Sequence, residues 1–212
     1  MTPAVAFWIG LAVAVVYFPM SDGPKSWPRS VVKSVPLLAF AAAAWGSGAS
    51  LWLVAGLVLS ALGDFALSRR GDFAFLSGLG AFALVHVAYA IAFLDLSGRP
   101  LWDAFLLAPV LALFLIGVTG STEIWLAPHT NGLRWPIRVY AMVITLMGLA
   151  ALTLPIGQVT LGMTLFVASD VLIAMQLFRM GEDNPLVERT SWLTWGLYIA
   201  AQALILTGVM AL

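Results

Sequence analysis

Two aspartates lie inside long apolar stretches of the 212-residue chain, where an ionised side chain is costly. Asp64 follows Gly63 in one such stretch, and Asp170 follows Ser169 in another. Two carboxylates that share a pocket of low dielectric constant are not both ionised at neutral pH, because they repel each other and burial favours the neutral form. One carboxylic acid beside one carboxylate can carry out general acid–base hydrolysis. We therefore predict that Asp64 and Asp170 are catalytic.

Five more polar residues lie within apolar stretches or at their edges, and we predict that they bind substrate or orient the acids: Lys33, His86, Tyr140, Tyr198 and Gln202. One histidine and two acids beside a lysine form a poor ligand set for a metal ion, so we expect no metal and no other cofactor. The chain has no cysteine and no Gly-x-Ser-x-Gly motif. Thiol and serine nucleophiles therefore lack their sequence signatures.

The composition indicates that these residues are held in a membrane. Hydrophobic residues make up 62% of the chain and charged residues 9%, with a mean hydropathy of +1.00. An ordinary soluble domain carries about 25% charged residues. The chain is therefore predicted to be a single integral membrane domain over residues 1–212, in contact with the lipid bilayer. Its formal net charge is zero, which predicts no nucleic-acid partner because such a partner requires a concentrated basic surface.

The apolar runs predict an all-α fold, a polytopic membrane protein with eight transmembrane helices. A helix needs about 20 mostly apolar residues to cross the hydrocarbon core of a bilayer. Runs bounded by proline, glycine or charge give eight such segments, at residues 3–19, 34–49, 51–68, 73–94, 102–120, 136–154, 157–178 and 191–211.

The basic residues predict the orientation of these helices. Nine of the ten lysines and arginines fall on odd-numbered connections, and only Arg99 falls on an even-numbered one. Lys and Arg are retained on the cytoplasmic side of a membrane. We therefore expect both termini to lie outside, and we expect the membrane to be a bacterial inner membrane.

This topology predicts the depth of the polar residues. At about 1.5 Å per helical residue, Asp64 and Asp170 lie about 7 Å and about 13 Å from the cytoplasmic ends of their spans. Lys33 and Tyr140 lie in the first turns of spans that enter from the same face, while His86 lies about 20 Å deep. The two acids, the lysine and Tyr140 thus come from four helices into one half of the bilayer. We predict a single pocket that opens toward the cytoplasmic leaflet.

The positions of the two acids also raise the hypothesis of an internal duplication. Asp64 and Asp170 are 106 positions apart, half the chain length, and each follows a small residue in the third span of a four-span half. Four is an even number, so the two halves would be parallel repeats.

A series of short motifs extends over almost the whole chain, in this order: Lys33 with Pro36-Leu37, Gly56 to Ser60, Gly63-Asp64, Leu67, Phe75, Gly78-Leu79, Phe82, His86, Tyr89, Phe93, Tyr140, Met147, Phe166, Ser169-Asp170, Leu172, Tyr198, Ala201 and Gln202. With these motifs the chain resembles the YhhN-like membrane proteins, which include the lysoplasmalogenases and the mammalian transmembrane protein 86 relatives. One departure is that Ser34-Val35 separates Lys33 from Pro36, where the family pattern has lysine and proline adjacent.

The resemblance implies hydrolysis of the vinyl-ether bond of lysoplasmalogens, single-chain ether phospholipids, to a fatty aldehyde and glycerophosphocholine or glycerophosphoethanolamine. Protonation of the β-carbon of a vinyl ether leaves an oxocarbenium ion, which water attacks; an acid, a base and a nearby negative charge suffice. On this interpretation Asp170, expected to be the deeper and less solvated acid, donates the proton and Asp64 activates water, although the reverse assignment stays open. Lys33 would pair with the substrate phosphate, and Tyr140 or His86 would orient an acid.

Three other functions are consistent with the same residues. An intramembrane aspartyl protease is suggested by Gly63-Asp64, but Ala61 stands where such proteases have a first glycine. A proton-coupled transporter of small solutes or lipids would need a path to both faces of the membrane. A lipid-binding scaffold would carry out no chemistry.

Overall fold

The computed structural model describes residues 2–130, 132–181 and 184–212, and it is all-helical throughout these ranges. Its helices are α1 (Pro3–Tyr17), α2 (Trp27–Gly46), α3 (Leu51–Leu67), α4 (Asp72–Ser97), α5 (Ala104–Leu107), α6 (Pro109–Trp125), α7 (Arg134–Ala151), α8 (Gln158–Phe178) and α9 (Val187–Met210), with single 3-10 turns η1 (Phe18–Met20), η2 (Leu101–Asp103) and η3 (Ala127–His129). The prediction of an all-α fold is confirmed.

Each of the eight predicted segments corresponds to one long helix, but two of the boundaries were wrong. Helix α2 begins at Trp27 rather than at residue 34, because Ser26 caps its first turn and Pro28 fits there, while Pro36 is accommodated inside the helix. The fifth segment is interrupted at Ala108, whose extended φ of −143° separates α5 from α6. Proline disfavours the helical conformation of the residue before it, so Pro109 starts a new helix that continues to Trp125.

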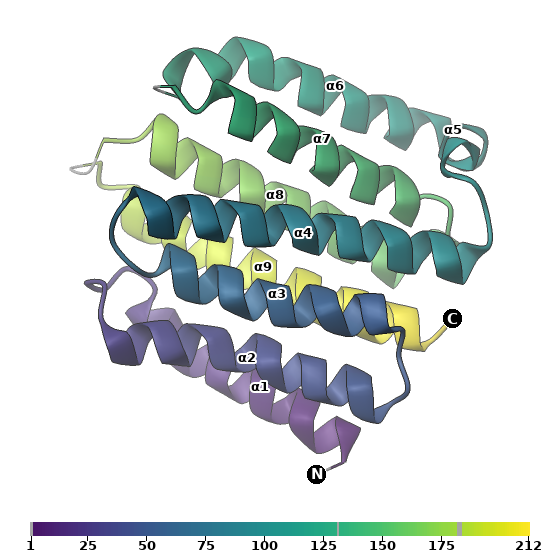
Figure 1. Ribbon diagram of the computed structural model, residues 1–212, viewed down its shortest axis with the longest axis horizontal. Helices are drawn as coiled ribbons and strands as arrows, with labels where there is room; N and C mark the ends of the chain where they lie inside the picture. Colours follow the sequence, from purple (N-terminus) through teal and green to yellow (C-terminus); the bar gives the residue numbers. More distant parts are fainter. Residues whose placement is uncertain (1, 131, 182–183) are drawn as a thin grey trace.

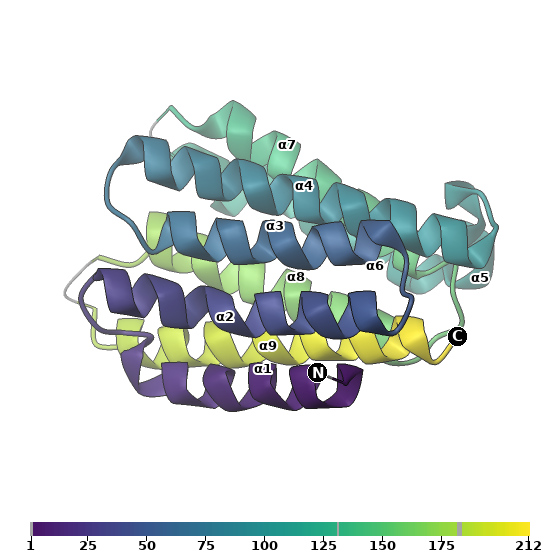
Figure 2. The same ribbon diagram turned by 60° about the horizontal axis from the view of Figure 1, so that its bottom comes forward.

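The helices pack side by side in an elongated bundle. Helices α1, α2, α3 and α4 follow one another as neighbours, α7 lies against α4, and α6 lies outside α7 (Figure 1). Helices α8 and α9 pack closely on each other behind this row, and α9 also touches α2 (Figure 2). Gly162 permits the α8–α9 contact, since a Cβ atom there would lie 2.9 Å from the Ala201 carbonyl oxygen. Residues distant in sequence, on α2, α3, α8 and α9, are thus brought close together.

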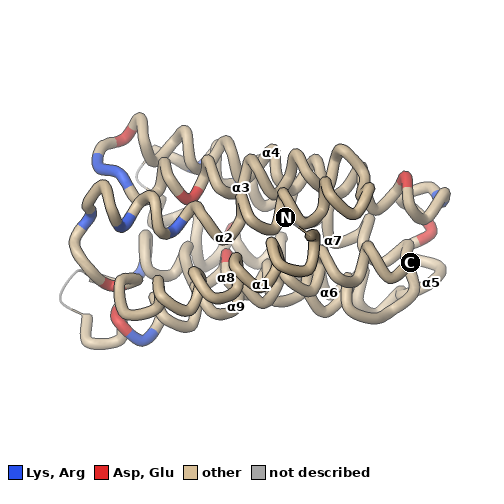
Figure 3. The backbone as a smooth tube through the Cα atoms, turned by 90° about the horizontal axis from the view of Figure 1, so that it is seen from below, with Lys and Arg blue, Asp and Glu red and all other residues tan. Residues whose placement is uncertain are grey.

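The two ends of the bundle differ in charge. Lysines and arginines gather at the end where α1 meets α2, α3 meets α4, α6 meets α7 and α8 meets α9 (Figure 3). Arg99 lies at the opposite end, 3.4 Å from Asp103. Both chain termini also lie at that opposite end (Figure 1). Most of the basic residues and the two termini therefore lie toward opposite ends of the bundle.

The outer surface is apolar enough for a membrane. Five helical segments are long and hydrophobic enough to cross a bilayer, namely Pro3–Met20, Asp72–Ser97, Pro109–His129, Gln158–Phe178 and Val187–Met210; the apolar helix α3 is shorter. Large hydrophobic side chains on α6, such as Val110, Leu113 and Phe114, point away from the protein. Contiguous apolar surface of this kind is rare on soluble monomers. The chain is an integral membrane protein.

Candidate functional site

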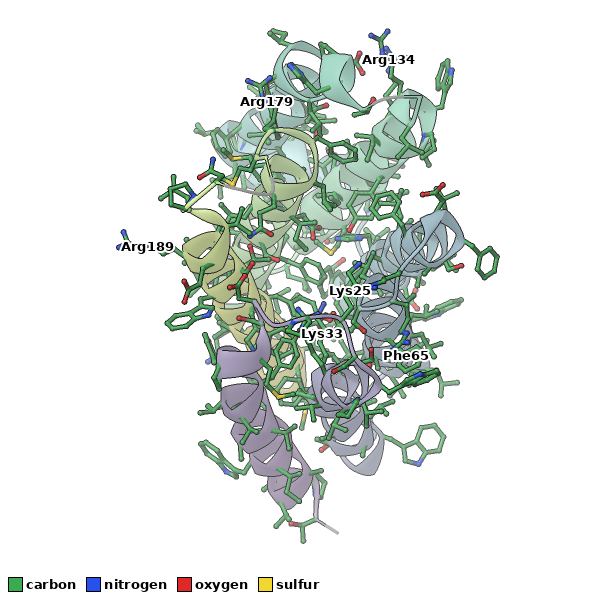
Figure 4. The ribbon with its side chains drawn as sticks, turned by 90° about the vertical axis from the view of Figure 1, so that its left-hand side faces the viewer. Lys25, Lys33, Phe65, Arg134, Arg179 and Arg189 are labelled. Atoms are coloured by element: carbon green, nitrogen blue, oxygen red, sulfur yellow. The ribbon has the colours of Figure 1, made fainter. Side chains whose placement is uncertain are left out.

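One cavity of about 290 Å³ collects most of the residues predicted to do chemistry. Its walls include five of the seven candidates: Lys33, Asp64, Tyr140, Asp170 and Tyr198. The view onto the basic end of the bundle shows Lys33 toward the middle of the helices, whereas Arg189 points outward (Figure 4). The structure therefore brings together side chains from α2, α3, α7, α8 and α9 around one space.

Asp64 is closely surrounded by hydrogen-bond donors. Its Oδ1 lies 3.0 Å from the Lys33 Nζ, and its Oδ2 accepts a hydrogen bond of 2.9 Å from the Tyr198 hydroxyl. The Asp64 side chain is only 2% exposed. An ammonium group and a phenol that both approach the carboxyl group favour its ionised form. Asp64 is therefore held between one cationic and one neutral hydrogen-bond donor.

Asp170 has different partners and a more open position. Its Oδ2 accepts a hydrogen bond of 3.3 Å from the Tyr140 hydroxyl and lies 3.3 Å from the His86 Nε2. That imidazole nitrogen is close enough for an ion pair but is not aligned for a hydrogen bond. Tyr140 and His86, both predicted to orient an acid, are the two side chains against Asp170.

The other nitrogen of His86 determines how the imidazole is protonated. Nδ1 lies 2.6 Å from the carbonyl oxygen of Phe82, one helical turn earlier on α4. A carbonyl oxygen can only accept, so Nδ1 carries a hydrogen. Nε2 of the neutral ring then has no hydrogen, and it faces the Asp170 carboxyl group at 3.3 Å. His86 and Asp170 therefore form one pair of neighbouring acid–base groups.

The prediction that Asp170 is the less solvated acid was wrong. The exposed fraction of its side chain is 10%, compared with 2% for Asp64. The reason is local packing: Lys33 from α2 and Tyr198 from α9 close over Asp64, while Asp170 faces the cavity. Distance along a helix from the membrane surface did not indicate how neighbouring helices cover a side chain.

A cluster of aromatic side chains contacts a partner of each acid. The Phe166 ring centroid lies 4.9 Å from that of His86 and 5.6 Å from that of Tyr198. Phe82 packs edge-on to both Phe166 and Tyr198. A partner of each acid thus contacts the same aromatic cluster.

Two of the seven predicted residues lie outside the cavity wall. His86 is behind Asp170, as described above. Gln202 is fully buried between α3, α4 and α9, where it donates a hydrogen bond of 2.9 Å to the Ser60 hydroxyl and accepts one from the Tyr89 hydroxyl. This network ties the three helices that support Asp64 and Tyr198, so Gln202 positions the site from outside it.

The cavity wall also contains polar residues that sequence reasoning missed, among them Tyr17, Arg29, Ser169 and Thr194. The hydroxyl oxygens of Ser169 and Thr194 are buried without a hydrogen-bond partner among the described residues. In the sequence, Arg29 is one of the basic residues that predict the orientation of the helices, and Tyr17 lies in the first apolar run. A helical-wheel argument relating Arg29 to Lys33, one turn apart, would have indicated that Arg29 lies on the same face of α2.

The donor groups do not gather as a metal site. Within residues 2–130, 132–181 and 184–212, no group of three or more His, Asp or Glu side chains is placed to hold a metal ion.

This protein is a helical membrane protein with two acids on the wall of a cavity near one end of its bundle. The sequence profile of the YhhN family matches residues 28–209, and the chain belongs to this family. Proteins named lysoplasmalogenase from Mycobacterium bovis and Mycobacterium tuberculosis are each 31% identical to it over 220 aligned positions, which cover 96% of this chain and 82% of each relative. No solved structure matches the chain.

Proposed function

We propose that this protein hydrolyses the vinyl-ether bond of lysoplasmalogens, giving a fatty aldehyde and a glycerophospho-choline or -ethanolamine. The observation that carries the proposal is the pair of acids with unlike partners, Asp64 beside a lysine and Asp170 beside a histidine, on the wall of one cavity. The name of the two mycobacterial relatives supports the same reaction.

The unlike partners suggest the division of roles. The His86–Asp170 pair donates its proton to the β-carbon of the vinyl ether, and the carbon bonded to oxygen becomes part of an oxocarbenium ion. Asp64, held as a carboxylate by Lys33 and Tyr198, stabilises this cation and accepts a proton from the attacking water. The hemiacetal that forms then breaks its bond to the glycerol oxygen, which takes the proton held by Asp64, while the hemiacetal hydroxyl gives its proton to the His86–Asp170 pair and becomes the carbonyl oxygen of the aldehyde. One water molecule is consumed, and both acids return to their starting protonation states.

The apolar part of the cavity suits the single chain of such a substrate. Side chains of Leu115 and Val118 on α6, Ile144 on α7 and Val167 on α8 form much of the wall away from the acids. Helices α6 and α8 make few contacts with each other, so the wall between them is thin. We infer that the alkenyl chain lies between α6, α7 and α8 and enters from the bilayer.

We further propose that all eight long helices cross a bacterial inner membrane, with the termini outside and the cavity toward the cytoplasmic leaflet. The accumulation of basic residues at the cavity end of the bundle, opposite the termini, supports this orientation. A cysteine placed at Thr2 and one at Gly132 are expected to react with an impermeant thiol reagent from opposite sides of sealed inverted vesicles. Labelling of both from the same side would contradict the odd number of crossings, five, between these two positions.

The test of the function is fatty-aldehyde release by the purified protein in detergent. A lysoplasmenyl lipid is supplied in one reaction, its ester lyso-lipid analogue in a second, and a transmembrane peptide in a third. We expect aldehyde from the vinyl ether only, and none from Asp64→Asn or Asp170→Asn. Folded wild-type protein that releases no aldehyde would contradict the proposal, and cleavage of the peptide would instead indicate the protease.

A further inference from the structure

In the structure, the residue expected to bind the phosphate of the proposed substrate is paired with Asp64 instead. Lys33 was expected to contact the phosphate, but its ammonium group lies 3.0 Å from Asp64 and its side chain is only 18% exposed. An ammonium group committed to a buried carboxylate is not available to a second anion without breaking that pair. Among the described residues, the other cation on the cavity wall is Arg29.

Arg29 lies on the cavity wall one helical turn from Lys33, on the side toward the basic end of the bundle. Its side chain is half-buried, and no carboxylate of the described residues lies within ion-pair distance of it. Lys33 and Asp64 neutralise each other, so Arg29 contributes uncompensated positive charge to a mostly apolar space. An ionisable side chain at such a place is a candidate for a functional role, and a guanidinium group suits an anionic ligand.

The guanidinium group of Arg29 is already held in place. Its Nε donates a hydrogen bond of 2.7 Å to the carbonyl oxygen of Met20, and its Nη2 donates one of 2.6 Å to the carbonyl oxygen of Ser21. The Tyr17 ring lies beneath it, with the centroid 5.7 Å from Cζ. A guanidinium group has five N–H donors, so three remain, two of them on the edge formed by Nη1 and Nη2. That edge can bind two oxygens of a phosphate side by side.

We propose that Arg29, with Tyr17 beneath it, binds the phosphodiester of the lyso-lipid headgroup and so sets the position of the scissile bond. Arg29 and Lys33 are four residues apart on α2, which separates their levels by about 6 Å along the helix axis. The glycerol backbone between the ether oxygen and the phosphate spans a comparable length. A phosphate on Arg29 therefore places the vinyl ether at the level of Asp64. The identity of the bound phosphate as part of a lysoplasmalogen rests on the proposed function. The binding experiment that tests the site does not depend on turnover.

The test measures binding rather than turnover. A saturated 1-O-alkyl lysophospholipid has no vinyl ether to hydrolyse, and the corresponding 1-O-alkylglycerol lacks only the phosphate and its headgroup. Binding of both compounds to the purified full-length protein in detergent is measured by calorimetry. We expect Arg29→Gln to weaken binding of the phospholipid at least about tenfold, the loss typical of a hydrogen bond to a charged group, and to leave binding of the alkylglycerol unchanged.

Three controls make the result decisive. Arg70→Gln makes the same change of charge at an exposed residue of the same end, outside the cavity wall, and is expected to have no effect. Arg29→Lys keeps the charge and is expected to retain part of the phospholipid affinity. Equal weakening of both compounds by Arg29→Gln would mean that Arg29 only supports the fold, and this would overturn the proposal. Inorganic phosphate that binds the wild-type protein as tightly as the phospholipid would also overturn it, since the site would then take free phosphate.

Binding and catalysis can fail separately. Phosphate-dependent binding that requires Arg29, in a protein that releases no aldehyde from the vinyl ether, would refute the hydrolase and leave the headgroup site standing. If the protein releases aldehyde but Arg29→Gln binds the phospholipid as tightly as the wild type does, the hydrolase would stand and the headgroup site would be refuted.

Discussion

The surroundings of Asp64 and Asp170 are built to the same plan but contain different chemistry. Each acid lies on the third long helix of one half of the chain. Each has one partner from the second long helix of the same half, Lys33 on α2 or Tyr140 on α7. Its other partner comes from the fourth long helix of the opposite half, Tyr198 on α9 or His86 on α4.

The residue numbers of corresponding positions agree with this plan. Asp170 and Asp64 differ by 106 positions, Tyr140 and Lys33 by 107, and Tyr198 and His86 by 112. We propose on this basis that the two halves descend from a duplicated four-helix unit. The lysine in one half and the histidine in the other make the two acids unlike. A lysine fixes a carboxylate, whereas a histidine shares a proton with one.

Removal of the Asp170 carboxyl group is expected to have the largest effect on turnover. Asp170→Asn leaves His86 without the acid that shares its proton, and kcat should fall about 10³-fold, within the range for loss of a general acid. Thermal stability in detergent should change little, because Asp170 has no lysine or arginine partner among the described residues. A stable variant with more than a tenth of the wild-type kcat would contradict the role of Asp170.

His86→Gln is expected to lower kcat about 10²-fold with little change in KM. The amide can still donate a hydrogen bond, but it cannot carry a transferable proton. Because His86 and Asp170 act as one unit, the double variant should be no slower than Asp170→Asn alone. Steady-state kinetics of the two single variants and the double variant measure this. If the loss of kcat in the double variant equals the product of the two single losses, the residues do not share a proton.

Asp64→Asn is expected to reduce stability as well as activity, in contrast to Asp170→Asn. It leaves the Lys33 ammonium group buried without its carboxylate, which should lower the free energy of unfolding by about 2–3 kcal/mol, somewhat less than for a fully buried pair. Adding Lys33→Met should restore most of this stability and none of the activity. Reversible unfolding in mixed micelles measures the change, and equal stability of Asp64→Asn and wild type would contradict the ion pair.

The smallest expected effects on kcat are those of removing the hydroxyl groups of the two tyrosines that donate to the acids. Tyr198→Phe removes a 2.9 Å hydrogen bond to the enclosed carboxylate of Asp64 and should lower kcat about tenfold. Tyr140→Phe removes a 3.3 Å hydrogen bond to the more open Asp170 and should lower kcat only about threefold. The initial rates of the two variants at saturating substrate give the comparison. The opposite order would mean that Asp170, not Asp64, is the more tightly held acid.

Much of this arrangement could be predicted from the sequence. Apolar runs indicated the long helices, and the rarity of charge within them selected Asp64 and Asp170, because an ionisable residue is seldom retained there without a role. The sequence did not reveal which side chains pair, since Lys33–Asp64 and His86–Asp170 join helices distant in the chain. It also did not reveal the relative exposure of the acids, which depends on how α9 covers α3. Arg29 was overlooked because its charge fits equally well with a cytoplasmic loop.

In the proposed mechanism a proton is delivered to a carbon atom of the vinyl ether, and hydrolysis in heavy water measures this step. The lysoplasmenyl lipid is turned over in D₂O enriched in ¹⁸O, and the aldehyde is reduced at once so that it cannot exchange. Aldehyde incubated with the enzyme under the same conditions serves as the exchange control. We expect one deuterium on the carbon next to the carbonyl and no ¹⁸O in the released glycerophospholipid headgroup. Aldehyde without that deuterium, or ¹⁸O in the glycerol, would show that the vinyl ether is cleaved by another route.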